Sequence, residues 1–242
     1  MTMPRASAPT PPRFEHRTDD GPVLGIGTAS PRLSWTVPAA DPGFEQTAYE
    51  LEVAAGQRSG GAEVVRVESP DQVLVPWPVA PLASRESAWV RVRVRGGSSD
   101  GSGRQDAEAW SPWSDPAVVE AGLDAAHDWV ARFISPRELG GLDMPAPILR
   151  GTMALPVGEV LKARLYTTAY GTYIATLNGR RVGDEVLAPG WTSYQHRLRY
   201  QTHDVTGLVR EGGNALEVLL GNGWYRGRLG WDGRHAHYGD RL

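Results

Sequence analysis

Aromatic and arginine side chains gather between residues 191 and 226 in a combination that could bind a sugar. A carbohydrate site stacks the C–H face of the sugar ring on a flat aromatic side chain and hydrogen-bonds the hydroxyl groups to polar side chains. The candidate residues are Trp191, Tyr194, Arg197, Trp224, Tyr225 and Arg226. The structural alternative is that Trp191 and Trp224 fill the two ends of a sandwich core, because large aromatic side chains are usually well buried. We favour the structural role and keep the sugar site as the functional alternative.

A second constellation places arginines on one face of a predicted strand. In the run WVRVRVR at 89–95 the arginines alternate with valines, and alternate strand residues share a face. The sequence WSPWS follows after a Gly/Ser-rich loop, and a similar WSxWS element in fibronectin-III modules of cytokine receptors stacks its tryptophans between strand arginines. We predict an intramolecular cation–π ladder, worth about 0.5–1 kcal/mol per exposed contact; the alternative is an interaction surface. The predicted members are Arg91, Arg93, Arg95, Trp110 and Trp113.

Three further segments contain residues that are found in catalytic, phosphate-binding or metal sites, and we interpret each of them as structural. Asp184 and Glu185 are adjacent, and strand neighbours point to opposite faces, so we predict hairpin surface rather than an acid–base pair. Gly221–Gly223 lacks the lysine and the following helix of a phosphate loop, which predicts a turn. One His-rich segment has the H-x-H spacing of some metal sites, but such composition is weak evidence, and we predict neither a metal nor a cofactor. Its members are Asp232, His235, His237 and Asp240.

Composition narrows the class of protein. The 242 residues include 29 Gly, 19 Pro and 9 Trp, which is typical of a loop-rich all-β chain. A formal net charge of −3 argues against nucleic acid as a partner, and the absence of cysteine excludes disulfides. No run approaches the ~18 apolar residues of a membrane span. Residues 1–12 lack the apolar segment of a secretory signal, so we expect a cytoplasmic protein.

Short alternating segments in residues 14–121 predict an immunoglobulin-like or fibronectin-III-like β-sandwich. In one of them Tyr49, Leu51 and Val53 fall on a common face. The tail 1–13 is expected to be disordered, and 122–128 is expected to be a linker. The predicted strands are 22–27, 31–37, 48–53, 64–67, 73–75 and 89–94.

Residues 129–242 predict a second sandwich of the jelly-roll kind. Asn178-Gly179 predicts a two-residue hairpin, because both central positions of a type I′ turn need positive φ. Asp204 is placed to cap a helical turn over 204–209. A jelly roll needs about eight strands; we count fewer and expect the domain to be truncated at its C-terminal end. The predicted strands are 161–168, 173–177, 197–202 and 214–220.

The amino-acid sequence of the second half is more informative than the order of its predicted strands. The run ARLYTTAYGTYIATLNGRRVGDEVLAPGWTSYQHRLRYQTHDVTGLVREGGNALEVLLGNGWYRGRLGW closely resembles the N-terminal domain of bacterial α-L-rhamnosidases of glycoside hydrolase family 78. The resemblance extends from about Trp129 to Trp231. PRLSWTV and QTAYELEVA resemble the fibronectin-III-like module that precedes this domain, although AEVVRVESPDQVLV stands where the family has a Trp-Ser-Gly strand. The resemblance implies a fibronectin-III/Ig-like sandwich followed by a galactose-binding-like jelly roll.

The resemblance also implies what the chain lacks. Family enzymes hydrolyse terminal α-L-rhamnose from glycosides with inversion, and their acid and base lie in a helical (α/α)6 barrel. No motif of that barrel occurs here, so we assign no catalytic residue and expect no activity from the chain alone. The expected partners are the missing barrel and rhamnosides. An apolar face or strand edge is expected to be exposed where further strands would pack.

Three functions follow from these observations. The leading hypothesis is a non-catalytic N-terminal region that orients the barrel of an α-L-rhamnosidase and extends its substrate cleft. The second is a stand-alone carbohydrate-binding module built on the aromatic set. The third is a fibronectin-III-type interaction protein that uses the WSPWS element; the absence of a signal peptide and of disulfides counts against it.

Overall fold

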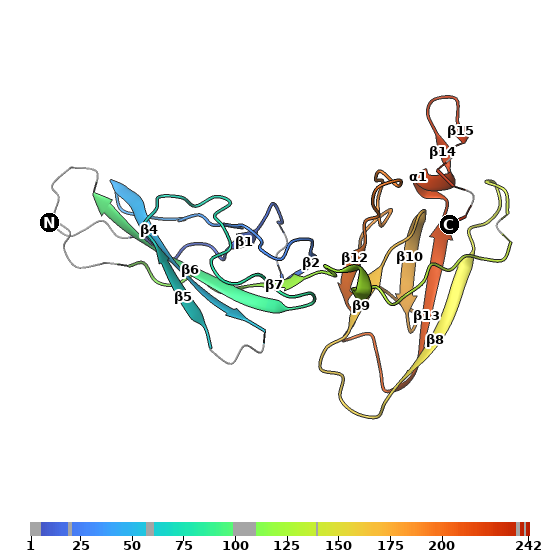
Figure 1. Ribbon diagram of the computed structural model, residues 1–242, viewed down its shortest axis with the longest axis horizontal. Coiled ribbons are helices and arrows are strands. Elements are labelled where there is room, and N and C mark those ends of the chain that lie inside the picture. Colours follow the sequence, from blue (N-terminus) through green and yellow to red (C-terminus); the bar gives the residue numbers. More distant parts are fainter. Residues whose placement is uncertain are drawn as a thin grey trace. The chain divides into compact units, whose positions relative to one another are not determined.

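The computed structural model describes residues 6–18, 21–56, 61–98, 110–138, 140–235, 238–239 and 241–242 (Figure 1). The chain divides into two compact units, Met1–Val130 and Ala131–Leu242. Both are built from strands, which confirms the predicted all-β class. The described residues hold one short helix, α1 (Gly223–Arg226), and one 3-10 turn, η1 (Ala126–Asp128). No helix among them is long and apolar enough to cross a membrane.

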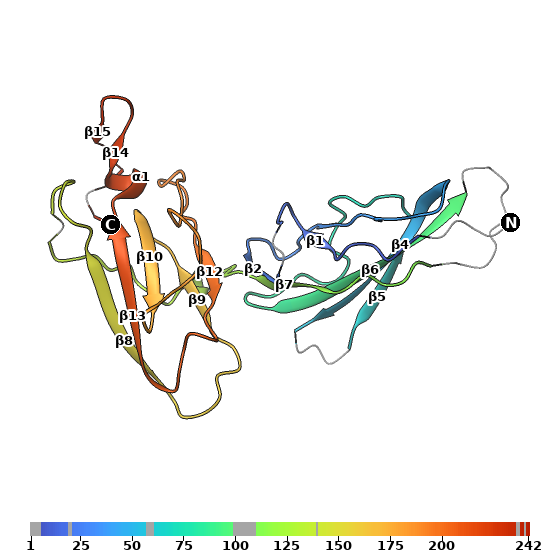
Figure 2. The same ribbon diagram turned by 180° about the vertical axis from the view of Figure 1, so that it is seen from behind.

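Unit 1 is organised on a five-stranded sheet in the order β2-β7-β6-β4-β5 (Figure 2). The pair β2 and β7 is parallel, and the other neighbours are antiparallel. A separate two-stranded sheet joins β1 to β3. The bounds are β1 Arg13–Phe14, β2 Val23–Ile26, β3 Leu33–Ser34, β4 Phe44–Ala55, β5 Glu63–Val67, β6 Ser87–Ser98 and β7 Ala117–Ala121.

The core of unit 1 follows the predicted alternation. Tyr49, Leu51 and Val53 of β4 are all buried, as expected from their spacing. Two predicted strands are shorter than expected, however. The segment 31–37 contributes only the two-residue β3, and 73–75 contributes one isolated bridge, between Leu33 and Val75. Leu74 has a φ of 53°, which breaks the extended backbone that a strand needs.

The residues predicted to form a cation–π ladder lie together on the sheet of unit 1. The Arg93 guanidinium carbon lies 5.1 Å from the centre of the Trp110 ring and 4.7 Å from that of Trp113. Arg91 lies 4.9 Å from Trp113, and Arg95 lies 5.5 Å from Trp110. Trp113 therefore contacts two arginines of β6, and Trp110 contacts two arginines of β6 and also Arg66 of β5, at 5.3 Å.

The same arginines are paired with carboxylates. Arg93 Nε donates to Glu50 Oε2 at 2.7 Å, and Glu50 is a buried residue, 8% exposed. Arg91 of β6 pairs with Glu52, which lies on β4 like Glu50. Arg95 pairs with Glu68 at 2.6 Å. The tryptophans are thus stacked on cations whose charge is already neutralised, and the ladder ties β6 to β4.

The serines of WSPWS complete the edge of β6. β7 pairs with β6 only from Ser87 to Val90. Farther along, the Ser111 and Ser114 amides donate to the Val94 and Val92 carbonyls at 2.8 Å. Their hydroxyl groups accept from the Val94 and Val92 amides at 3.0 Å. The motif therefore acts as a substitute strand.

Unit 2 contains a four-stranded sheet in the order β11-β10-β13-β8 and a two-stranded sheet of β12 and β9. In Figures 1 and 2, β8, β13 and β10 lie side by side. A small hairpin, β14–β15, follows α1. The bounds are β8 Ile148–Leu155, β9 Arg164–Thr167, β10 Thr172–Leu177, β11 Arg180–Arg181, β12 Gln201–Asp204, β13 Gly212–Gly221, β14 Arg228–Leu229 and β15 Arg234–His235.

Several expectations for unit 2 were wrong in detail. The predicted strand 197–202 begins only at Gln201, because the His196 and Arg197 amides bond to the Ser193 carbonyl and close a turn. We expected a turn with no following helix at Gly221–Gly223, but the one-turn helix α1 begins at Gly223. β8 was not predicted at all, since its sequence ILRGTMAL does not alternate. The predicted strand 161–168 is shortened to β9.

The Asn178-Gly179 turn is confirmed and anchors the surrounding turns. Its residues have φ of 52° and 77°, and Leu177 pairs with Arg180. The side-chain nitrogen Nδ2 of Asn178 donates to the Leu208 carbonyl at 2.9 Å and to Asn214 Oδ1 at 2.8 Å. Leu208 belongs to the predicted helical turn, where Asp204 Oδ1 accepts from the Thr206 amide at 2.9 Å. The turn residue thus fixes two loops at once.

Tyr173 holds the loop that carries Trp191. Its hydroxyl group hydrogen-bonds to Thr167 and donates to Gln201 Oε1 at 2.9 Å. Its amide donates to the Ala188 carbonyl at 2.8 Å, and Gln201 Nε2 donates to the Pro189 carbonyl at 3.4 Å. Burial raises the pKa of Tyr173 from 10.0 to about 12; the Thr167 hydrogen bond opposes that rise, and the charge of Glu185 adds to it.

The ladder predicts a measurable loss of stability for Arg93→Ala. Two cation–π contacts of about 0.5–1 kcal/mol each disappear, and the buried Glu50 carboxylate loses a partner. We expect the free energy of unfolding of unit 1 to fall by about 2 kcal/mol, and by about half of that for Arg93→Lys, which keeps the charge. Urea unfolding followed by tryptophan fluorescence measures both. Arg13→Ala, an exposed arginine of β1, is the matched control, and equal midpoints for the two alanine variants would refute a stabilising ladder.

The raised pKa of Tyr173 predicts a pH dependence for unit 2. The native state resists loss of the phenol proton, so the stabilisation is complete below pH 10 and is lost as the pH rises to about 12. A shift of this size corresponds to about 2–3 kcal/mol. The difference in unfolding free energy between the unchanged protein and Tyr173→Phe should therefore shrink over this range, as measured by urea titrations at successive pH values. A constant difference would contradict the buried, protonated phenol.

Candidate functional site

The segment 182–200 between β11 and β12 presents the first half of the candidate site. Ala188 and Pro189 are buried, while Gly190, with a φ of 90°, turns the chain outward. The next residue, Trp191, is 51% exposed, and Tyr194 is half-buried. A buried Ala-Pro pair followed by a glycine turn therefore lifts an indole ring to the surface.

Trp191 is stacked on Trp224 of α1. Their ring centres are 6.2 Å apart and the planes differ by 4°. The expectation that these two residues fill the ends of the core was wrong. The buried core of unit 2 is instead made of smaller side chains and one tyrosine, among them Tyr173, Ala175 and Leu177. The indole of Trp191 is too exposed to serve as core.

Tyr194 and Tyr225 belong to a separate aromatic cluster. Their rings meet edge to face with centres 5.0 Å apart. Tyr225 also stacks on Tyr170 at 4.6 Å, and Tyr194 contacts Tyr238 at 5.0 Å. Phe133 stacks on Tyr170 at 4.9 Å. These contacts join residues near the beginning and the end of the unit 2 sequence. The cluster therefore has a packing role.

The hydroxyl oxygen of Tyr194 is buried without a hydrogen-bond partner among the described residues. Burial raises the pKa of Tyr194, and the neighbouring Tyr238 and Tyr225 add to the rise. The group therefore stays a neutral hydrogen-bond donor at physiological pH.

The two candidate arginines are engaged with their own surroundings. Arg197 Nε donates to Thr192 Oγ1 at 3.3 Å. Arg226 donates to Asn222 Oδ1 at 3.1 Å and to the Gly140 carbonyl at 2.8 Å. The structure thus brings Trp191 to Trp224 and Tyr194 to Tyr225, while the hydrogen bonds of both arginines go to loops rather than to either aromatic pair.

The acidic and histidine residues singled out in the sequence form no metal cluster in the described part of the chain. Asp184 and Glu185 are exposed and follow β11 instead of lying on a strand. Asp232 pairs with Arg234 at 2.5 Å. His237, Asp240 and the side chain of His235 lie outside the described residues. Among those described, no three His, Cys, Asp or Glu side chains are grouped to hold a metal.

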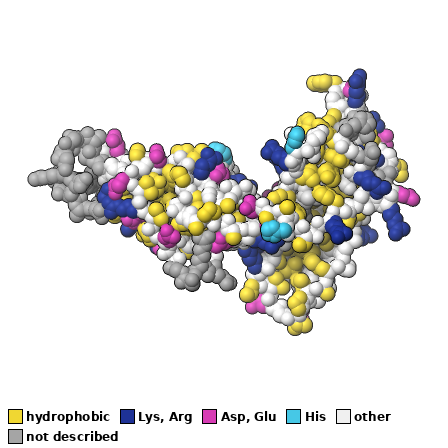
Figure 3. Space-filling view, viewed as in Figure 1, with side chains coloured by type: hydrophobic (Ala, Val, Ile, Leu, Met, Phe, Trp, Pro, Cys, Tyr) yellow, Lys and Arg dark blue, Asp and Glu magenta, His cyan; other side chains and the backbone are white. Residues whose placement is uncertain are grey.

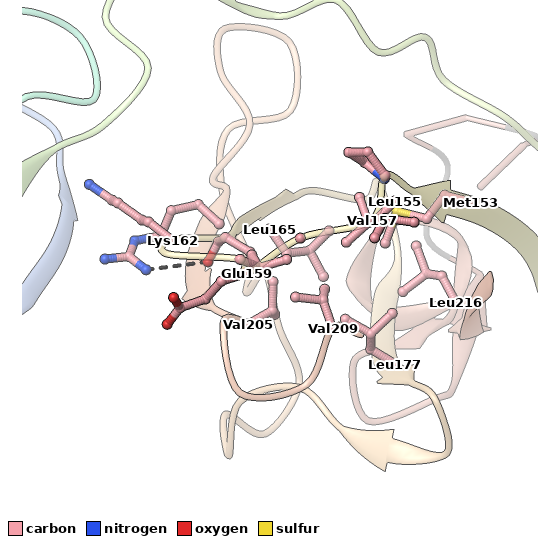
Figure 4. Close-up of a pocket in the computed structure, with 15 residues that line it drawn as sticks. Met153, Leu155, Val157, Glu159, Lys162, Leu165, Leu177, Val205, Val209 and Leu216 are labelled. Carbon is pink, nitrogen blue, oxygen red and sulfur yellow. Dashed lines mark hydrogen bonds between the residues drawn. The ribbon is translucent and has the colours of Figure 1, made fainter. Parts of the chain in front are cut away.

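Unit 2 also has an apolar groove between its two sheets, which sequence reasoning did not locate (Figure 4). The inner groove has a volume of about 390 Å³. At its β8 end it is apolar, and the charged ends of Glu159 and Lys162 both lie on the opposite side. In the space-filling view apolar side chains adjoin one another across unit 2 (Figure 3). The apolar lining residues include Met153, Leu155, Val157, Leu165, Leu177, Val205, Val209 and Leu216.

Two family models match the chain, one in each unit. The Rha78A-like N-terminal immunoglobulin domain matches residues 9–125, and the α-L-rhamnosidase N-terminal domain matches residues 158–242. The finer assignment of unit 1 to fibronectin III stays a prediction.

The relatives that the chain matches are much longer than the chain itself. It is 44% identical over 137 residues to an α-L-rhamnosidase of Streptomyces avermitilis, which covers 56% of this chain and 13% of that protein. It is 32% identical over 220 residues to an α-L-rhamnosidase of Formosa agariphila, covering 86% of this chain and 23% of that protein. The crystal structure of an α-L-rhamnosidase from Aspergillus terreus superposes with a TM-score of 0.81 at 44% identity, covering 98% of this chain and 26% of that one.

These matches agree with one another over both units. The family models lie on either side of the boundary between Val130 and Ala131, and the superposition spans both units. The chain therefore carries two domains that are characteristic of α-L-rhamnosidases, the Rha78A-like N-terminal immunoglobulin domain and the α-L-rhamnosidase N-terminal domain.

Proposed function

We propose that this chain acts as the N-terminal accessory region of an α-L-rhamnosidase and orients a catalytic barrel supplied by further polypeptide. The observation that carries the proposal is the extent of the match: 98% of this chain corresponds to 26% of the Aspergillus terreus enzyme. The role is positional, since the acid and base that glycoside hydrolysis needs are expected on the barrel. Terminal α-L-rhamnosides would be substrates of the whole enzyme.

A chimera tests this proposal. The matching part of the Aspergillus terreus enzyme is replaced by this chain, and hydrolysis of 4-nitrophenyl α-L-rhamnoside is measured. At 44% identity the replacement should preserve the contacts with the rest of that enzyme. We expect kcat/KM within about tenfold of the parent, a difference of about 1.4 kcal/mol in transition-state free energy, and no hydrolysis by the 242-residue chain alone.

Two results would contradict an accessory role. One is rhamnoside hydrolysis by the isolated chain. The other is an Aspergillus terreus enzyme that keeps its yield, thermal stability and kcat/KM after the matching part has been deleted.

A second candidate function is carbohydrate binding at the surface formed by Trp191 and Trp224. The observation in its favour is the exposure of Trp191, 51%, on a stacked partner, where a core residue was expected. An exposed indole supported from behind offers a flat apolar face to the C–H side of a sugar ring. L-rhamnose is the ligand to try first, because the relatives are α-L-rhamnosidases.

Trp191→Ala tests this second function. We expect affinity for L-rhamnose, measured by calorimetry, to fall at least about tenfold, or 1.4 kcal/mol, while the unfolding midpoint stays unchanged. Trp231→Ala is the matched control, since Trp231 is fully exposed in the turn between β14 and β15. Equal affinities for the two variants, or no binding by the unchanged chain, would refute the site.

The arrangement gives no support to an interaction role for WSPWS. Both tryptophan rings are covered by arginines of their own sheet, and both serines serve as backbone partners of β6. A partner would have to displace these contacts first.

A further inference from the structure

β8 is an edge strand with little protection against pairing. Among the described residues β13 alone pairs with it, and its outer edge closes the four-stranded sheet. Natural edge strands are blocked by charges, proline or bulges. In the eight residues of β8 the one charged side chain is Arg150, whose Nε bonds to Glu217 of β13 at 2.7 Å. Ile148 and Met153 are 52% and 42% exposed.

The other unit shows how this chain protects an edge elsewhere. β5, at the margin of the five-stranded sheet, has only five residues and carries Glu63 and Arg66 as exposed charges. These charges make pairing with another strand costly. The lack of protecting charges is therefore specific to the edge of β8 and is not shared by the edge strand β5.

The inner groove lies directly behind this edge. In the register between β8 and β13, Gly151 pairs with Leu216, and residues paired across two antiparallel strands lie on the same face of the sheet. Met153 and Leu155 alternate with Gly151 along β8, so both share the inward face with Leu216. All three side chains line the groove. A strand added beside β8 at the usual spacing of about 4.8 Å would direct alternate side chains over this opening.

We propose that β8 is a site of β-strand addition, and that the incoming strand is an apolar segment of the remaining polypeptide of an α-L-rhamnosidase. The inference rests on the proposed function. The strand pairs its backbone with the outer edge of β8 and places apolar side chains at every second position in the inner groove. Main-chain bonds supply affinity in this mode, and the pocket supplies selectivity.

Two other occupants fit these observations less well. A small apolar ligand would fill the groove but leave the backbone donors and acceptors of β8 unpaired. A second copy could pair its own β8, but it competes with strands held in the same polypeptide. The chain spans only 23% and 26% of two relatives, and tethering gives effective concentrations of about millimolar order.

The test uses the 242-residue chain and short overlapping synthetic peptides that cover the part of the Aspergillus terreus enzyme beyond the match. Amide hydrogen exchange by mass spectrometry follows each mixture. One peptide should slow exchange in residues 148–155 by about tenfold or more and raise the melting temperature. Protection of β8 in the chain alone, with a dimer by light scattering, would overturn the proposal in favour of a second copy. Protection by none of the peptides would overturn it outright.

A matched pair of variants tests the groove. Val157 and Val186 are 85% and 80% exposed, so replacing either with Glu leaves folding intact; only Val157 lines the groove. Val157→Glu should weaken peptide binding about tenfold or more, and Val186→Glu should leave it unchanged. Equal effects would refute insertion into the groove. An active chimera without any protecting peptide would reject strand addition while leaving the accessory function in place.

Discussion

Unit 2 depends on one buried side chain, the carboxamide of Asn214, which is 1% exposed. Its nitrogen donates to the Arg210 and Gly212 carbonyls at 2.7 and 3.0 Å, and its oxygen accepts from the Arg210 amide and from Asn178. Buried backbone groups outside sheets must find partners, since an unsatisfied one costs about 1–3 kcal/mol. Asn214 satisfies several at once and so fixes the hairpin at Asn178, the preceding turn and the start of β13 relative to one another.

Unit 1 solves the same problem with hydroxyl groups. Ser111 and Ser114 satisfy the amides of Val94 and Val92, where β6 extends past its partner β7. The tryptophans beside them then cover the arginines of β6. In both units a polar side chain replaces a missing backbone partner, and the apolar packing is built around it. The units differ at their margins: β5 is closed by charges, whereas β8 is open and apolar.

The parts of the fold that could be predicted are those with a local physical signature. Alternation of apolar and polar residues located β4 and β6. The Asn-Gly pair located the hairpin at Asn178, because these two residue types favour the positive φ that the turn requires. β8 could not be found this way, since most of its residues are exposed and little burial constrains its sequence to alternate. The exposure of Trp191 was also unpredictable. It depends on the Gly190 turn and on Tyr173 holding the Ala188 carbonyl, a contact between distant segments.

The aromatic surface and the inner groove are formed by different residues and offer different interactions, so each would suit a different kind of ligand. Trp191 and Trp224 offer rigid ring faces supported by Tyr173 through the loop backbone, and no residue of this pair lines the groove. The groove offers flexible aliphatic side chains next to an open strand edge, which suits a polypeptide better than a sugar. A surface that recognises ligand and an edge that recognises protein can therefore coexist on one small sandwich. Occupation of the groove would stiffen β8 and β13, and β13 leads directly into α1 and Trp224.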